Sequence, residues 1–234
     1  MLKKLFTSLL SGKSTNRSNR ISEDEQVRIS KTSNVNTLNK KAYSLLREAT
    51  KHKNIDLEYS INCLKDSIQL ADDNNLIYGI QDRLRLPKYL QLAGRNDEAW
   101  SEYNKIVNKI ISNTDPIGLK CGDLMYVYDS MRLHLQREKK FNKAIVFHVM
   151  SILYKVKLAH IANVKNNIEY YDIKDNLRKE LCNQLKKTTK LDLLDPITND
   201  VFNEIKKKTN IDVNQCAHKI KEYMNDGDET GLSE

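Results

Sequence analysis

The histidines are the first side chains in this sequence that could hold a metal ion or act as a general base. There are five of them: His52, His134, His148, His160 and His218. No two lie three to five residues apart, as the two ligands of a zinc site on one helix do, and no HExxH motif occurs. The neighbouring acids Asp172, Asp175, Asp192 and Asp195 lack the glycine-bearing loop of a calcium site. The sequence therefore predicts no metal site.

The cysteines and loops give no catalytic signal either. Cys63, Cys121, Cys182 and Cys216 form no CxxC pair, and neither a Gly-rich phosphate loop nor a GxSxG motif is present. Cys63 borders an apolar helical stripe and is predicted to be a core residue. So few cysteines in 234 residues favour a reducing, cytoplasmic location. We expect no cofactor and no enzymatic activity. A Cys182–histidine pair formed only in the folded chain remains an alternative.

The lysine-rich segments are the next candidates for chemistry, because the chain has a net charge of +8. The densest runs are residues 186–190 and Lys206, Lys207 and Lys208. Aromatic residues do not interleave with these runs, so no base-stacking platform is predicted. Contact with nucleic-acid phosphates alone is the alternative function. Lysines at helix ends also complement the helix dipole, which needs no ligand.

The elements that must position these side chains are predicted to be helices. Only 7 Gly and 3 Pro occur, and apolar residues recur at helical spacing. We expect helices at about 38–51, 57–71, 76–93, 97–110, 123–138, 144–161, 164–189, 198–208 and 212–224. The expected cap and break residues are Asn54 or Asp56, Asn96 or Asp97, Gly94, and Asp195 with Pro196. Pro87 either kinks the segment 76–93 or divides it into two short helices.

Two segments of the chain share one pattern of residues. Each has Asp-x-x-Arg-Leu in one helix, then a tight basic turn, then an alanine near the start of the next helix. The turns read Gly94-x4-Ala99-x3-Tyr103 and Lys139-x4-Ala144-x3-His148. Ala99 and Ala144 are 45 residues apart, a period that is typical of helical hairpin arrays.

On these turn residues the chain resembles the tetratricopeptide repeat (TPR) family. The resemblance covers about 120 residues, with an earlier, poorer copy at 42–71 that has Ser60 and Leu64 at the alanine and aromatic positions. It implies an all-α fold, a right-handed stack of antiparallel helical hairpins (a TPR-like α-solenoid) with additional C-terminal helices. The family period is 34 residues, its first-helix Trp-Leu-Gly pattern is not met, and Pro87 stands where a small residue is usual. A generic stack of helical hairpins is the alternative.

The resemblance also implies a concave groove that is lined mainly by the first helix of each pair and that holds a peptide or protein. The candidate partner-binding residues are Asp82, Arg85, Lys88, Asp129, Arg132 and Gln136. Two arginines one repeat apart could present matched forks to carboxylates or phosphates. The alternative is that Asp and Arg pair within each helix at the i, i+3 spacing.

Four regions are expected along the chain. They are a flexible basic leader (1–36), the TPR-like repeats (37–161), a C-terminal helical extension (162–224) and an acidic tail (225–234). Within the leader, five apolar residues fall on one helical face beside Lys3 and Lys4, which is compatible with peripheral membrane contact: Leu2, Leu5, Phe6, Leu9 and Leu10. The function we predict is a non-enzymatic protein-binding scaffold, adaptor or regulator. The oligomeric state is left open.

Overall fold

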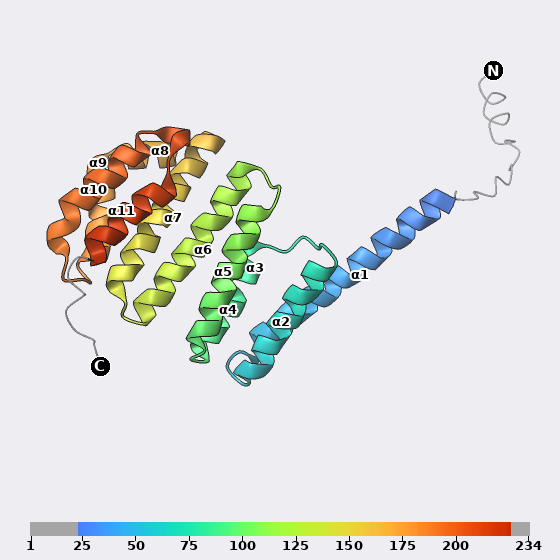
Figure 1. The fold of residues 1–234 in the computed structure, drawn as a ribbon. Coiled ribbons are helices and arrows are strands. Elements are labelled where there is room, and N and C mark those ends of the chain that lie inside the picture. Colours follow the sequence, from blue (N-terminus) through green and yellow to red (C-terminus); the bar gives the residue numbers. More distant parts are fainter. Residues whose placement is uncertain (1–22, 226–234) are drawn as a thin grey trace, which may run out of the picture.

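The structure is a computed structural model in which residues 23–225 are described, with side chains from residue 34 onward. Within this part of the chain all regular structure is helical, and no strand occurs. The prediction of an all-α fold is therefore confirmed. Residues 1–22 of the predicted leader (1–36) and residues 226–234 of the acidic tail lie outside the described residues, whereas residues 23–36 belong to α1. Figure 1 shows α1 and α2 at one end of the molecule and α8 to α11 at the other.

The helices and their bounds are α1 (Glu23–His52), α2 (Leu57–Asp73), α3 (Ile80–Arg83), α4 (Arg85–Leu92), α5 (Asn96–Ser112), α6 (Ile117–Arg137), α7 (Phe141–Ala162), α8 (Lys165–Tyr171), α9 (Lys174–Leu185), α10 (Leu194–Ile205) and α11 (Val213–Asn225). Two short 3₁₀ turns, Leu191–Leu193 and Lys208–Asn210, flank α10. Consecutive helices pack in pairs, α1 with α2, α4 with α5, and α6 with α7. Helix α2 also packs on α4, α5 packs on α6, and α11 packs on α7.

The two turns that share a sequence pattern also share a backbone geometry. Gly94 and Lys139 both have positive φ, of 73° and 60°. The residue after each donates its N–H to the carbonyl five residues earlier, Arg95 to Leu90 and Lys140 to Leu135, both at 2.9 Å. This is the Schellman arrangement, which ends a helix with a left-handed residue. Gly94 therefore has the C′ position that the sequence predicts.

Small residues allow the paired helices to approach closely. Ala99 and Ala144 are both in the first turns of their helices, and their side chains are 0% and 2% exposed. Tyr103, one helical turn after Ala99, is fully buried and fills the neighbouring space. Larger side chains at the alanine positions would meet the partner helix, because protein cores leave little free volume.

Several predicted boundaries are wrong at the start of helices. Helix α1 begins at Glu23, well before the predicted start near Leu38, because residues 23–37 contain no Gly or Pro and open with acids that favour a helix N-terminus. Helix α6 begins at Ile117 and not at Asp123. Gly118 and Gly122 lie within α6, where their missing side chains make room for Ile161 and Leu158 of α7.

Other predicted breaks and caps also differ. Asp195 and Pro196 do not separate two helices but form the first turn of α10, where proline is tolerated because its N–H would have no helical partner. The segment 164–189 is divided into α8 and α9. Arg95, not Asn96 or Asp97, holds the N-cap position of α5, without a side-chain bond. The alternative of two short helices around Pro87 is confirmed by α3 and α4, and Asp56 caps α2 by accepting from the Tyr59 N–H.

The buried side chains form one large core and two smaller clusters. The large core joins α5, α6 and α7 to α9, α10 and α11 through fully buried residues such as Val127, Leu153 and Leu181. A second cluster joins α1 and α2 to α4, and it includes Cys63, which is 5% exposed and thus a core residue as predicted. A third small cluster of Ala42, Ala71 and Leu76 holds α1 against the end of α2.

Candidate functional site

Four of the six predicted partner-binding residues come together on α4 and α6. Arg132 donates from Nε and Nη2 to Asp129 Oδ1 at 2.9 and 2.6 Å. The pKa of Lys88 is lowered by burial and by Arg137 nearby, whereas Asp129 acts on it in the opposite direction. Lys88 of α4 is therefore close enough to Asp129 and Arg137 of α6 to interact with both charges. These side chains share one face of the two helices.

Hydrogen bonds extend this face from α4 to α9. Gln136 donates to Gln184 Oε1 at 2.5 Å, and Arg137 donates to Gln91 Oε1 at 2.8 Å. Gln91 in turn donates to the His134 carbonyl at 3.0 Å. We call this set the polar strip: Lys88, Gln91, Asp129, Arg132, Gln136, Arg137 and Gln184. It carries three cations and one acid.

The other two predicted residues do not join the polar strip through any contact with it. Arg85 donates to the Leu46 carbonyl of α1 at 2.8 Å and to the Thr50 hydroxyl. Its ion pair with Asp82 is loose, at 4.0 Å. Arg85 therefore ties α4 to α1, and its side chain is mostly enclosed. The i, i+3 pairing that the sequence left open is present in both copies, tightly for Arg132 with Asp129 and loosely for Arg85 with Asp82.

A buried histidine lies behind the polar strip. The side chain of His148 on α7 is 9% exposed, and neither ring nitrogen has a hydrogen-bond partner among the described residues. Glu180 Oε1 of α9 is 3.7 Å from Nε2, beyond hydrogen-bond distance. Burial lowers the pKa of His148 to about 4, and the cations Arg132, Lys187 and Lys155 contribute while Asp129 opposes them. His148 is therefore neutral at pH 7.

A row of aromatic rings crosses the opposite part of the same helices. Ring centroids are 6.0 Å apart for Trp100 and Phe147, 6.0 Å for Phe147 and Tyr128, and 5.7 Å for Tyr128 and Tyr154. Tyr128 is buried, whereas the other three rings are half-buried. We call these four residues of α5, α6 and α7 the aromatic face. Trp100 and Phe147 each recur with other apolar residues at helical spacing in the sequence, but only the fold brings the four rings into one row.

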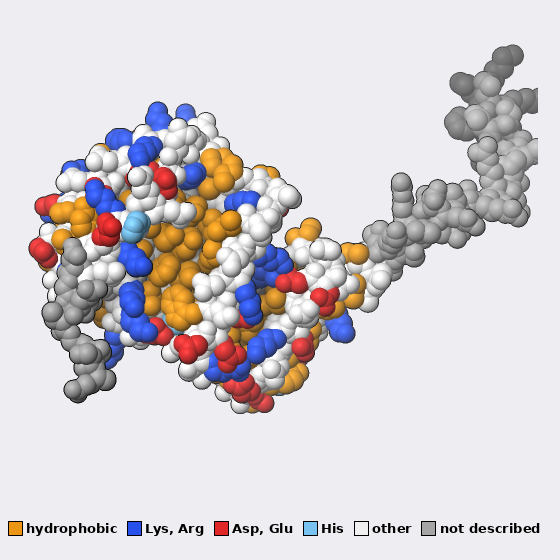
Figure 2. All heavy atoms as spheres, viewed as in Figure 1, with side chains coloured by type: hydrophobic (Ala, Val, Ile, Leu, Met, Phe, Trp, Pro, Cys, Tyr) orange, Lys and Arg blue, Asp and Glu red, His pale blue; other side chains and the backbone are white. Residues whose placement is uncertain are grey.

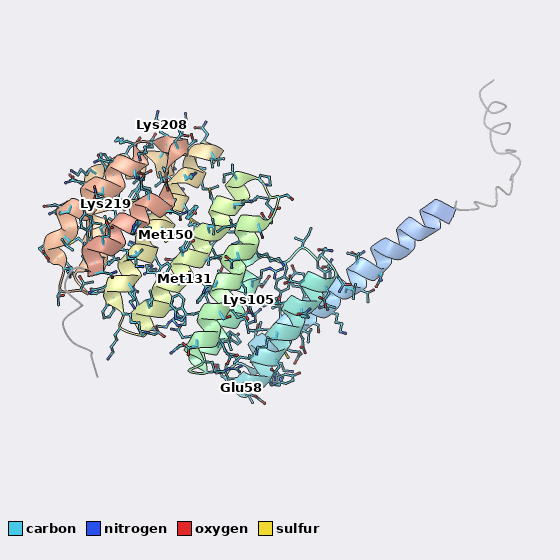
Figure 3. The ribbon with its side chains drawn as sticks, in the orientation of Figure 1. Glu58, Lys105, Met131, Met150, Lys208 and Lys219 are labelled. Carbon is cyan, nitrogen blue, oxygen red and sulfur yellow. The ribbon has the colours of Figure 1, made fainter. Side chains whose placement is uncertain are left out.

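The aromatic face belongs to a wider apolar surface. Figure 2 shows hydrophobic side chains gathered over α6 and α7, between α5 and α11, with Lys and Arg side chains along the α11 side. Met131 and Met150 lie in this region in Figure 3, on α6 and α7. Scattered apolar side chains are ordinary on a soluble surface, but a contiguous patch is typical of an interaction site.

The described residues show no arrangement that prepares a nucleophile or a metal ion. No group of three or more His, Cys, Asp and Glu side chains among residues 34–225 could hold a metal. Burial raises the pKa of the Cys121 thiol, and it raises the pKa of the Cys216 thiol to about 12. A thiol must ionise to act as a nucleophile, so these two cysteines are unreactive core residues.

Helix α7 is long and apolar enough to span a membrane by length and composition. Half of its apolar stretch is buried against the rest of the fold, and the core helix of a soluble protein has the same properties. Phe147 and Tyr154 of this helix belong to the aromatic face. No protein-family model, curated protein or solved structure matches this chain, so its site is defined by its own geometry.

Proposed function

We propose that this protein is a non-enzymatic protein-binding scaffold whose main contact surface is the aromatic face. The pairs α1–α2, α4–α5 and α6–α7 would form a short TPR-like stack, with α8 to α11 as a helical extension. The proposal keeps the function that the sequence predicts, but it moves the main contact surface from the first helices of the pairs to a surface shared by α5, α6 and α7.

The half-buried row of Trp100, Phe147 and Tyr154, with Tyr128 beneath it, is the observation that carries the proposal. Aromatic side chains give most of the binding energy at protein interfaces, because each buries a large area with few rotatable bonds to fix. Leaving three such rings partly in water costs free energy in the isolated protein. A partner that covers them recovers this free energy.

The chemistry of the surface favours an amphipathic helix with acidic flanks as the partner element. An apolar strip along α6 and α7 accepts the apolar stripe of a helix. Basic side chains along the α11 edge in Figure 2 would attract carboxylates on the rim of that helix. The polar strip, with three cations and one acid, supports an acidic partner as a second contact, in which Lys88 and Arg132 keep their predicted role.

Nucleic-acid binding, the alternative from the sequence, has less support. Lys206 lies 3.6 Å from Asp172, and Lys207 lies 2.7 Å from Glu204. Both lysines therefore have carboxylate neighbours, which reduces the positive charge that they offer to a phosphate backbone. No exposed aromatic row accompanies them.

Tryptophan fluorescence can report on this surface, because Trp100 is the single tryptophan of the chain and belongs to the aromatic face. Proteins retained by the immobilised full-length chain would be compared between the wild type, the double variant Phe147→Ser/Tyr154→Ser and the control Tyr59→Ser. Tyr59 is an exposed tyrosine of α2, away from the aromatic face. A specific partner is expected to be lost from the double variant alone.

The partner found in this way is then purified and titrated into the wild-type chain. Covering Trp100 should shift its emission to shorter wavelength. Circular dichroism of each variant establishes that it is folded. Equal retention of the partner by all three chains, or unchanged emission at saturation, would show that the aromatic face is not the contact surface. An emission shift with duplex RNA or DNA and not with protein would favour the alternative.

A further inference from the structure

A groove separates the second helices of the first two pairs. It lies between α2 and α5, has α3 at its base, and has a volume of about 650 Å³. Its lining is about as polar as it is apolar. The apolar side chains are Ile68 and Ile80, which are half-buried, and Leu76, Leu86, Ile106 and Ile110, which are buried. An apolar groove between two helices is the usual receptor for the apolar face of a third helix.

The charges along this groove are paired except at one end. The pairs are Lys65 with Glu98, Lys105 with Glu102, and both Arg83 and Lys109 with Asp72. Asp115 and Asp123 line the end of the groove beyond these pairs, and no cation among the described residues pairs with them. Lys120 nearby donates instead to the carbonyls of Ile111 and Asn113, at 3.0 and 2.6 Å.

The two carboxylates have no cationic partner among the described residues, although Asp115 accepts from the Asn113 amide at 2.5 Å. The pKa of Asp123 is raised by burial and, in second place, by the negative charge of Asp115. A cation placed between them would remove this repulsion. This end of the groove therefore fits a positively charged group that is attached to an apolar helix.

We propose that the groove between α2 and α5 holds the N-terminal segment Met1–Gly12 of the same chain. The sequence predicts that its five apolar residues share one face when the segment is helical, and that face would match the apolar side chains of the groove. Lys3 borders that face at about a right angle and supplies a cation for Asp115 and Asp123, and the neighbouring Lys4 adds positive charge to the same segment. The occupant thus matches the groove in both hydrophobicity and charge.

The chain between the segment and α1 is long enough for this docking. Leu38 of α1 packs on the cluster that contains Leu76, a residue of the groove. Helix α1 begins at Glu23, 15 residues before Leu38. At 1.5 Å per residue, Glu23 therefore lies about 22 Å from Leu38 along the helix axis. Residues 13–22 can span about 33 Å when extended. The segment can therefore return to the groove from which α1 departs.

Carbodiimide cross-linking of the full-length chain tests this placement directly, because the reagent joins a lysine amine to a neighbouring carboxylate with loss of water. Peptides that link Lys3 or Lys4 to Asp115 or Asp123 are expected within one chain. The pair of Lys109 and Asp72, whose atoms are 2.5 Å apart, provides the positive control in the same groove. A mixture of isotopically light and heavy chains separates links within one copy from links between copies.

Two matched variants test whether the apolar face positions the lysines. Leu5→Asp/Phe6→Asp should reduce the link about tenfold or more, because two anchoring side chains are lost. Thr7→Asp/Ser8→Asp, with the same added charge on the other face, should retain it. The proposal is overturned if the Lys109 control forms without the N-terminal link, if the link joins two copies, or if Lys3 and Lys4 react mainly with the acids of 226–234.

Discussion

The buried histidine on α7 predicts a specific dependence of stability on pH. In the unfolded chain His148 has a pKa of about 6.5, whereas burial lowers its pKa in the folded protein to about 4. Between these two values the unfolded chain binds a proton that the folded chain does not. Stability therefore falls as the pH falls from 6.5 to 4, and the loss is complete below pH 4.

The size of this effect follows from the same two values. A shift of one pKa unit corresponds to about 1.4 kcal/mol, so the difference for His148 amounts to about 3 kcal/mol at most. Burial of the ring sets the sign, and the charges near the ring add to it. Arg132 of α6, Lys155 of α7 and Lys187 beyond α9 disfavour the charged ring, and Asp129 opposes them only in part. Glu180, at 3.7 Å, is too far to accept a hydrogen bond.

Urea denaturation at pH 4 to 8 measures the effect in the wild type and in His148→Gln, which cannot titrate. Other groups, including His134 with its lowered pKa, contribute equally to both proteins and cancel in the difference. The free energy of unfolding of the wild type relative to the variant should fall by about 3 kcal/mol from pH 7 to pH 4. The control is His218→Gln, at a residue whose side chain is 75% exposed. For this control the difference in free energy of unfolding between the wild type and the variant should not change with pH in this way. A wild-type-minus-variant difference that is constant with pH would refute the reasoning.

Three further predictions concern the turns, the arginines and the close helix pair. Gly94→Ala should destabilise the protein by about 1 kcal/mol and Lys139→Gly should stabilise it by up to about 1 kcal/mol in thermal denaturation, because both positions have positive φ. Arg85→Ala should cost about 1–3 kcal/mol and expose α1 to limited proteolysis, whereas Arg132→Ala, whose bonds lie within its own helix, should leave α1 protected. Ala99→Leu should destabilise by about 1–3 kcal/mol in urea, because its side chain is fully buried.

Local signals in the sequence were sufficient for the helices and for the turn geometry. Gly94 and Ala99 are defined by their own backbone and by the neighbouring helix, so their roles could be predicted from residue type and spacing. The start of α6 could not, because Gly118 is typical of a loop until Ile161 and Leu158 of α7 are placed against it. The start of α1 was missed because its first turns lack the apolar spacing on which the prediction depended.

The candidate surfaces depend on contacts between distant residues, which spacing alone does not define. Lys88, Asp129, Arg132 and Gln136 were predicted as a set, and the fold brings them together on one face. The aromatic face was not predicted, since Trp100, Tyr128 and Phe147 come from three different helices. The only sequence signal was the helical periodicity of the individual rings, which is shared by ordinary core residues.

The two Asp-x-x-Arg-Leu motifs show why equal motifs acquired different roles. Pro87 follows Arg85 by two residues, and the residue at the same place after Arg132 is His134. A proline excludes the helical hydrogen bond to the carbonyl four residues before it, which here belongs to Arg83, the last residue of α3. The helix therefore restarts at Arg85, and this arginine donates to the Leu46 carbonyl within α1, which also accepts from the Thr50 hydroxyl. Helix α6 has no such break, so Arg132 stays within regular helix and pairs with Asp129. Because of this one proline, Arg85 binds α4 to α1, whereas Arg132 remains in the polar strip.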